Sequence, residues 1–263
     1  MLKPLVAAAA LASTAALSSS PALATIVEFE TVLGNVQVNL YDETTPETVD
    51  NFLSYVESGA YDNTFFHRLV PEFILQGGGF LYIEDSGDVE SIETDDPVVN
   101  EPEWSNRQGT IAMAKLGNDP NSATSQWFFN LENNHENLDV QNGGFTVFGE
   151  VISGMSVLED IAELPRFNLQ GAFTNLPLRN YGEEELENDV EVDSTHLVTL
   201  LSVRVIDDAE NSAADLDPVP NTLIDTVDDK DSGGSSGGAM GWLMLVFGLV
   251  GLRKALGAKS RRQ

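Results

Sequence analysis

The chain has 263 residues, of which 42% are hydrophobic, so it is long enough for one sizeable folded domain with accessory segments. It carries 42 acidic residues against 13 Lys and Arg, a formal net charge of −29 that opposes binding to nucleic acid or to an anionic membrane surface. It contains no cysteine, which excludes disulfides, thiolate metal sites and cysteine nucleophiles.

The first 24 residues have the pattern of a secretory signal peptide. Lys3 is followed by an apolar run from Leu5 to Leu17, and Ala22-Leu23-Ala24 places small residues at the point of cleavage. We therefore predict that residues 1–24 are removed and that the chain is exported, to the periplasm or to the cell surface.

The next two segments predict a hairpin and a helix. Residues 25–41 alternate apolar and polar side chains on either side of a Gly-Asn turn, which favours two short paired strands. Residues 45–59 begin with Thr45 as an N-cap and Pro46 at the first helical position, and they end at Gly59, which predicts a helix.

The rest of the domain predicts many short strands and one more helix. The helix covers about residues 156–164, where apolar side chains recur at helical spacing. Short β-like runs occupy residues 65–69, 73–76, 110–116, 126–130, 146–151 and 196–206. Many short strands with only two helices indicate a mainly β fold, a closed or nearly closed barrel with helices over its ends.

Three polar segments interrupt or follow this pattern. Residues 84–103 and 183–193 are acidic, and we expect both to be solvated surface loops. Residues 208–238 are rich in Asp, Ser, Pro and Gly, with too few apolar side chains to form a core, so they predict a flexible acidic linker. The folded domain is then expected to span residues 25–207.

Residues 239–263 combine an apolar run with a basic end. The run, Ala239 to Leu252, is 14 residues long, shorter than the roughly 17 to 25 of a comfortable membrane-spanning helix. One interpretation is a membrane anchor that leaves its Arg and Lys in the cytoplasm. The other is a resemblance to Gly-Gly carboxy-terminal sorting signals that a rhomboid-type protease cuts. Either way, this segment is expected to contact the inner membrane or a sorting protease, and to tether the chain at least before any processing.

Two long blocks carry the clearest signal of function. "FFHRLVPEFILQGGGF" at residues 65–80 and "GTIAMAKLGNDPNSATSQWFFNL" at residues 109–131 resemble the signature of the cyclophilin family of peptidyl-prolyl isomerases, and "FTVFGEVISGM" at residues 145–155 matches a third block. The resemblance covers about residues 25–207. It implies an eight-stranded antiparallel closed β-barrel capped by two α-helices, and an isomerase that needs neither a cofactor nor a metal.

The chemistry explains why an arginine stands among apolar residues. Rotation about an Xaa-Pro bond must overcome amide resonance, a barrier of about 20 kcal/mol. In the twisted state the prolyl nitrogen regains a lone pair and can accept a hydrogen bond, which the planar amide nitrogen cannot. A guanidinium aimed at that nitrogen binds the transition state better than either ground state. We predict that Arg68 is this donor, strengthened by apolar neighbours that exclude water.

The resemblance also implies roles for other residues. Gln76 would hold the substrate backbone and support Arg68, Gln126 would shape the neighbouring surface, and Ala114 and the backbone of Lys115 would lie along the peptide groove. The pocket for the proline ring would be lined by Phe73, Met113, Phe128, Leu138 and Phe145. Two positions depart from the pattern of many relatives: Asn137 stands where a Trp is common, and Phe145 stands where a His is common.

The same residues also have purely structural interpretations. The pocket aromatics could be ordinary core, and Arg68 could form a structural ion pair with one of the many acids. We predict a monomeric prolyl isomerase that acts on proline-containing polypeptides during the folding of exported proteins and has no nucleic-acid partner. The alternative is a noncatalytic proline-peptide-binding chaperone or a surface-displayed binding module.

Overall fold

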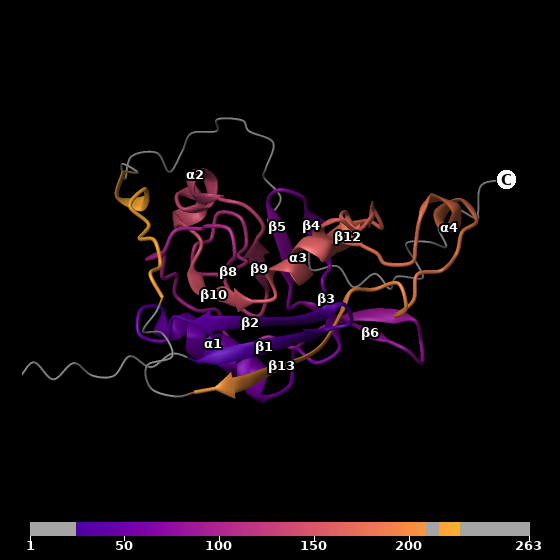
Figure 1. The fold of residues 1–263 in the computed structure, drawn as a ribbon, viewed down its shortest axis with the longest axis horizontal. Helices are drawn as coiled ribbons and strands as arrows, with labels where there is room; N and C mark the ends of the chain where they lie inside the picture. The colour runs from indigo at the N-terminus through magenta and orange to yellow at the C-terminus, as the bar shows by residue number, and fades with distance from the viewer. Residues whose placement is uncertain (1–24, 209–215, 227–263) are drawn as a thin grey trace, which may run out of the picture.

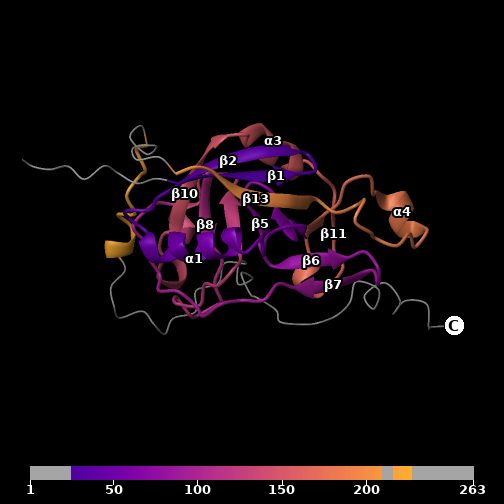
Figure 2. The ribbon, with the colours of Figure 1, turned by 90° about the horizontal axis from the view of Figure 1, so that it is seen from below.

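The computed structural model describes residues 25–208 and 216–226 (Figures 1 and 2). Its strands are β1 (Ile26–Thr31), β2 (Gly34–Leu40), β3 (Thr64–Phe65), β4 (Arg68–Val70), β5 (Ile74–Gly77), β6 (Phe80–Ile83), β7 (Asp88–Ser91), β8 (Thr110–Met113), β9 (Trp127–Asn130), β10 (Val147–Ser153), β11 (Arg166–Phe167), β12 (Leu176–Pro177) and β13 (Thr199–Asp207). Its α-helices are α1 (Pro46–Glu57), α2 (His135–Leu138), α3 (Met155–Ala162) and α4 (Glu183–Glu187), with 3-10 turns η1 (Gln141–Gly143), η2 (Gly171–Phe173) and η3 (Ile224–Thr226).

The fold is mainly β, as predicted. In the described part of the chain, eleven strands form one antiparallel sheet in the order β4-β5-β9-β8-β10-β2-β1-β13-β3-β6-β7, and β11 pairs with β12. The predicted hairpin is confirmed, since β1 and β2 pair with Thr31 opposite Gly34. The two predicted helices are confirmed as α1 and α3, which lie on opposite sides of the sheet in Figure 2. The short helices α2 and α4 were not predicted.

The two end strands of the sheet, β4 and β7, do not pair with each other. Among the described residues, the strands therefore do not form the expected eight-stranded closed barrel by continuous pairing. The chain itself bridges part of the gap, because β3 and β4 are separated by only two residues. The first of these, Phe66, donates its backbone N–H to Val198 O beside β13, whereas the second, His67, donates to Gln76 O in β5.

Alternation along the strands produces two apolar layers. Side chains that point into the fold form a central core with α1 and α3, and this core includes Leu75, Ile111, Trp127 and Phe129. The side chains between them point to the other face, where a second group, here called the outer cluster, gathers over β5, β9 and β8. The alternating pattern therefore decides which residues can build a site on the outside of the sheet.

The two acidic segments are more ordered than expected. Residues 84–103 include strand β7, which pairs with β6, and residues 183–193 include helix α4. Each segment contributes a buried valine, Val89 or Val192, to a satellite cluster that also holds Phe80 and Phe173. The prediction of two loops was wrong in these parts, because single apolar residues within an acidic run are enough to dock it on a neighbouring hydrophobic surface.

The described part of the predicted linker is docked against the domain. Residues 216–226, here called the strap, lie alongside residues 103–105, where Trp104 and Pro220 form an antiparallel bridge. In both views the strap lies at the end of the molecule opposite α4 (Figures 1 and 2). A flexible tether was expected here, and for these eleven residues the expectation was wrong, because the strap is held by specific hydrogen bonds rather than by a large apolar area.

The signal peptide predicted at residues 1–24 and the apolar segment predicted at residues 239–263 lie outside the described residues. Within residues 25–208 and 216–226, no helix has the length and apolar content needed to cross a membrane.

Candidate functional site

The site is built on one row of side chains that crosses four strands. Arg68 in β4 lies opposite Gln76 in β5, Gln76 lies opposite Phe128 in β9, and Phe128 lies opposite Ala112 in β8. Directly opposed residues in antiparallel strands point to the same face of a sheet. The register therefore brings a cation, an amide and an aromatic ring together on the outside of the sheet.

The polar half of this row is a chain of three side chains. The Arg68 guanidinium Nη1 donates to Gln76 Oε1 at 3.4 Å, and Gln76 Nε2 donates to Gln126 Oε1 at 2.9 Å. Partial burial lowers the pKa of Arg68, yet arginine stays cationic in proteins. Within the described ranges no carboxylate forms an ion pair with Arg68, whereas Arg204 pairs with Asp62. The cation is held in place without being neutralised.

The apolar half of the site is the outer cluster. It contains four of the five residues predicted to line the proline pocket, together with neighbours from the same sheet face; its buried members are Tyr41, Phe73, Ile74, Ala112, Ala114, Phe128, Leu138, Phe145 and Val147. Phe128 and Phe145 meet edge to face, with ring centroids 5.8 Å apart. Phe73 is 8% exposed, and Phe128 and Leu138 are fully buried.

Met113 is the exception among the predicted pocket residues. It is fully buried and belongs to the central core, together with Ile111 two residues before it. Ala112 and Ala114, on either side of Met113, belong to the outer cluster. The prediction that Met113 lines the pocket was wrong, because successive side chains in a strand point to opposite faces.

Lys115 uses its side chain for structure. The side chain is 1% exposed, and its ammonium Nζ donates to Gly144 O at 2.6 Å, to Asn142 O at 2.9 Å and to Asn100 Oδ1 at 3.1 Å. Burial lowers the pKa of Lys115 to about 8, and the nearby Asp119 carboxylate opposes the shift. The ammonium also lies 4.7 Å from the centre of the Phe145 ring. Lys115 thus fixes the loop that carries Phe145.

The glycine run explains how Gln126 reaches Gln76. A Cβ atom at Gly79 would lie 2.6 Å from Gln126 Nε2, and one at Gly78, where φ is +74°, would lie 2.6 Å from Trp127 Nε1. No side chain fits at either position without moving these neighbours. The backbone of Gly78 and Gly79 therefore provides the close approach that Gln126 and Trp127 need.

His67 does not offer an acid or a base. Burial and the adjacent Arg68 lower the pKa of its imidazole to about 3, so the ring is neutral over the physiological range. The ring packs edge to face on Phe80, with centroids 4.9 Å apart. The described residues also include no group of three or more His, Asp or Glu that could hold a metal ion.

Comparison with known proteins then identifies the family. Residues 26–183 match the model of the cyclophilin type peptidyl-prolyl cis-trans isomerase/CLD family. The chain belongs to the cyclophilin family. The resemblance drawn from the signature blocks is confirmed, and with it the assignment as a peptidyl-prolyl cis-trans isomerase.

Curated relatives of this cyclophilin have the same activity in their names. A peptidyl-prolyl cis-trans isomerase of Acinetobacter baylyi is 42% identical over 165 residues, which cover 61% of this chain and 84% of the relative. Peptidyl-prolyl cis-trans isomerase A of Dickeya dadantii is 40% identical over 168 residues, covering 60% and 83%. A solved cyclophilin-type isomerase of Cryptosporidium parvum is 22% identical, with a TM-score of 0.48 over 69% of this chain and 99% of that one.

Ile74 and Ala112 belong to the outer cluster but were not predicted from the signature. Both are fully buried members of the outer cluster, and each lies two residues from a predicted site residue in the same strand or its extension, Gln76 or Ala114. The period-two alternation of strands was the signal that could have found them, and it would also have placed Met113 on the other face.

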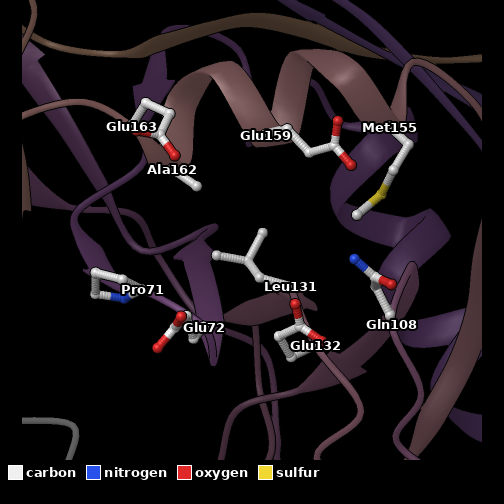
Figure 3. A pocket seen from close by; sticks show the side chains of 9 residues that line it. All are labelled: Pro71, Glu72, Gln108, Leu131, Glu132, Met155, Glu159, Ala162 and Glu163. Atoms are coloured by element: carbon white, nitrogen blue, oxygen red, sulfur yellow. The ribbon is translucent and has the colours of Figure 1, made fainter.

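A separate hollow of about 210 Å³ lies between α3 and the turn that joins β4 to β5 (Figure 3). Leu131 and Met155 give it apolar walls, and it is ringed by the carboxylates of Glu72, Glu132, Glu159 and Glu163. None of its lining residues is a cation, so this hollow cannot stabilise a prolyl nitrogen in the way that Arg68 can. This hollow is therefore distinct from the site built on Arg68 and the outer cluster.

Proposed function

We propose that this cyclophilin assists the folding of exported proteins by donating a hydrogen bond from Arg68 to the prolyl nitrogen of a twisted Xaa-Pro bond. One observation carries the proposal: Arg68 stands in register with Gln76 and Phe128 on one sheet face, and no carboxylate of the described residues neutralises it. The substrates are proline-containing segments of polypeptides.

The energetics follow from differential binding. The planar amide nitrogen offers no lone pair, so the guanidinium gains its hydrogen bond only as the bond twists. Each 1.36 kcal/mol of preferential stabilisation accelerates rotation about tenfold. The apolar outer cluster beside Arg68 lowers the local dielectric and strengthens the contact. No bond to carbon forms or breaks, and the proton stays on the guanidinium.

The neighbouring residues orient Arg68 and bind the rest of the substrate. Gln76 keeps Arg68 oriented and binds the substrate backbone, and Gln126 fixes the Gln76 amide through the 2.9 Å hydrogen bond. Phe73, Phe128, Leu138 and Phe145 receive the proline ring. Ala114 and the backbone of Lys115 border the groove that the extended peptide follows.

A protease-coupled assay on a short Xaa-Pro peptide tests this assignment, using the full chain. Arg68→Ala should lower kcat/KM by about 10²- to 10³-fold, the cost of losing one transition-state donor, and Arg68→Lys should recover only part of it because the planar fork is lost. Arg204→Ala is the matched control, since Arg204 is an exposed arginine that pairs with Asp62 away from the row. Equal kcat/KM values for Arg68→Ala and the wild type would contradict the mechanism.

We further propose an exported, monomeric protein in four parts: a signal peptide at residues 1–24, an isomerase domain at 25–207, an acidic linker at 208–238 whose residues 216–226 dock on that domain, and a membrane-contacting segment at 239–263. The charge pattern of both termini supports this order. The mass of the protein purified from cells, together with its fraction, tests it. A chain that starts at Thr25 supports export, and loss of residues after the Gly-rich stretch supports sorting rather than anchoring. Retention of residues 1–24 would overturn the proposal.

Closure of the barrel completes the proposal. We infer that residues 64–70 behave as one bent strand that pairs with β13 before the bend and with β5 after it, which closes the sheet around the central core. The hydrogen bonds from Phe66 to Val198 and from His67 to Gln76 support this. Slow exchange of both amide protons, comparable with that of β9, is the expected result, and rapid exchange of either would contradict it.

A further inference from the structure

The strap, residues 216–226, lies beyond residues 26–183, the span that the family model matches. It makes backbone contacts with the domain. Ser105 donates its backbone N–H to Val219 O at 2.8 Å, and Asn221 donates its backbone N–H to Glu103 O at 2.8 Å. These bonds lie on either side of the bridge between Trp104 and Pro220. The strap therefore adds a short antiparallel partner to residues 103–105.

Asn221 connects the strap to the helix beside the outer cluster. Its side chain is buried, and Nδ2 donates to the backbone carbonyl of Asp139 at 2.8 Å. Its Oδ1 accepts the backbone N–H groups of Leu223 at 3.2 Å and Ile224 at 3.1 Å. Both ends of the amide are thus used, one by the strap itself and one by the domain.

Asp139 is the residue through which this contact reaches the site. It is the C-cap of α2, is 1% exposed, and accepts hydrogen bonds through its carboxylate from Ser105 Oγ at 2.6 Å and Asn106 N at 2.7 Å. The residue before it, Leu138, accepts the backbone N–H of Phe145 at 2.9 Å. Leu138 and Phe145 both belong to the outer cluster.

The helix that carries Leu138 depends on tertiary contacts for its position. Asn134 at its N-cap donates through Nδ2 to Phe73 O and to Asn130 Oδ1, both at 2.8 Å, and the strap adds contacts beside its C-terminal end. α2 has four residues and no side-chain capping hydrogen bond to its own backbone, and a helix of one turn is unstable without tertiary contacts. Leu216, at the start of the strap, packs directly against the outer cluster. The strap thus contacts the wall of the site at two points, one polar and one apolar.

We propose that Asn221 and Leu216 are positioning residues of the isomerase site, and that the strap fixes the wall formed by Leu138 and Phe145. The proposal rests on the proposed assignment of these two residues to the proline pocket. Loss of either strap contact lets α2 move, which widens the pocket and weakens binding of the proline ring while the donor Arg68 stays in place. The expected signature is a rise in KM with little change in kcat.

Four substitutions in the full chain provide the test. Asn221→Ala removes the bond to Asp139, and Leu216→Ala removes the apolar contact. Thr222→Ala and Val219→Ala are matched controls on the same segment, since Thr222 is exposed and Val219 is 45% exposed. The measurements are KM and kcat on a short Xaa-Pro peptide, the Kd of a proline peptide by NMR titration, and the melting temperature.

We expect Asn221→Ala and Leu216→Ala to raise KM and Kd about three- to tenfold, with kcat within about twofold, while both controls match the wild type. Leu216→Met, which conserves volume, should have the KM of the wild type. The two Leu216 variants keep the test valid if Asn221→Ala fails to fold. Unchanged KM and Kd, with only a lower melting temperature, would overturn the positioning role. The Arg68→Ala variant separates the two proposals: if it loses activity while the strap variants bind normally, only the strap inference fails.

Discussion

Arg68 and Gln76 face each other directly across β4 and β5, and the guanidinium Nη1 reaches Gln76 Oε1 at 3.4 Å. The other end of the Gln76 amide is occupied, because its Nε2 donates to Gln126 at 2.9 Å. This second bond determines which atom Gln76 presents to the arginine. The orientation of the Arg68 guanidinium therefore depends on Gln126, the residue that precedes β9.

Replacing Gln126 tests that dependence. Gln126→Ala should lower kcat/KM about three- to tenfold, because a typical intramolecular hydrogen bond contributes about 0.5–1.5 kcal/mol and the Gln76 amide becomes free to rotate. Gln108→Ala, an exposed glutamine away from the row, is the control. The protease-coupled assay and a melting curve distinguish lost orientation from lost stability. An unchanged kcat/KM would show that Gln76 holds its orientation without Gln126.

Met113 and Phe128 lie on adjacent strands but on opposite faces, and a pair of substitutions should separate them. Met113→Ala should lower the free energy of unfolding by about 2–5 kcal/mol, as cavities in a core do, and should leave KM unchanged under conditions where the variant is folded. Phe128→Leu should instead raise KM severalfold, because Phe128 belongs to the outer cluster. Urea unfolding and peptide kinetics on both variants check this. A raised KM for Met113→Ala would restore Met113 to the pocket.

The outcome for Met113 illustrates what the sequence could and could not specify. The hairpin, α1 and α3 follow from local signals such as alternation, the Thr45-Pro46 start and helical spacing, so they were predictable. Matching a signature residue by residue ignores which way each side chain points, and so Met113 was placed on the wrong face while Ile74 was missed. The strap was beyond local reasoning. Its composition is that of a tether, and its docking depends on Asn221 meeting Asp139, 82 residues earlier in the chain, and on Leu216 meeting the outer cluster.

Glu72 has a left-handed backbone, with φ of +54°, in the turn between β4 and β5. A residue with a Cβ pays about 1–2 kcal/mol for this conformation, and Glu72 also shares the hollow of Figure 3 with three other glutamates. Glu72→Gly should therefore raise the free energy of unfolding by up to about 1 kcal/mol after the entropic cost of glycine, or the melting temperature by about 2–4 °C.

Asn118→Gly is the control for this substitution. Asn118 is also left-handed, with φ of +63°, but asparagine tolerates that region, so little change is expected. Calorimetry at low and high salt divides the gain from Glu72→Gly into two parts, because salt screens the charge repulsion and leaves the backbone contribution. A destabilised Glu72→Gly would mean that the Glu72 side chain makes a favourable contact in the turn.

Lys115 gives the protein a pH-dependent stability with a defined sign. Burial lowers the pKa of its ammonium from 10.5 to about 8 in the folded protein. Between pH 8 and 10.5 the unfolded chain therefore binds more protons than the folded one at this position. The free energy of unfolding should rise with pH over that window, and the penalty for burying the charge should be fully present below pH 8.

Urea unfolding of the wild type and of Lys115→Met at pH 7.5, 8.5 and 9.5 measures this contribution. The wild type should gain about 1–3 kcal/mol relative to the variant across the window, and the other titrating groups cancel in the comparison because both proteins contain them. Lys115→Arg should also lack the slope, since a guanidinium stays charged throughout. Parallel pH profiles for the wild type and Lys115→Met would show that the ammonium titrates as it does in water, in which case its three hydrogen bonds to Asn100, Asn142 and Gly144 fully offset the burial.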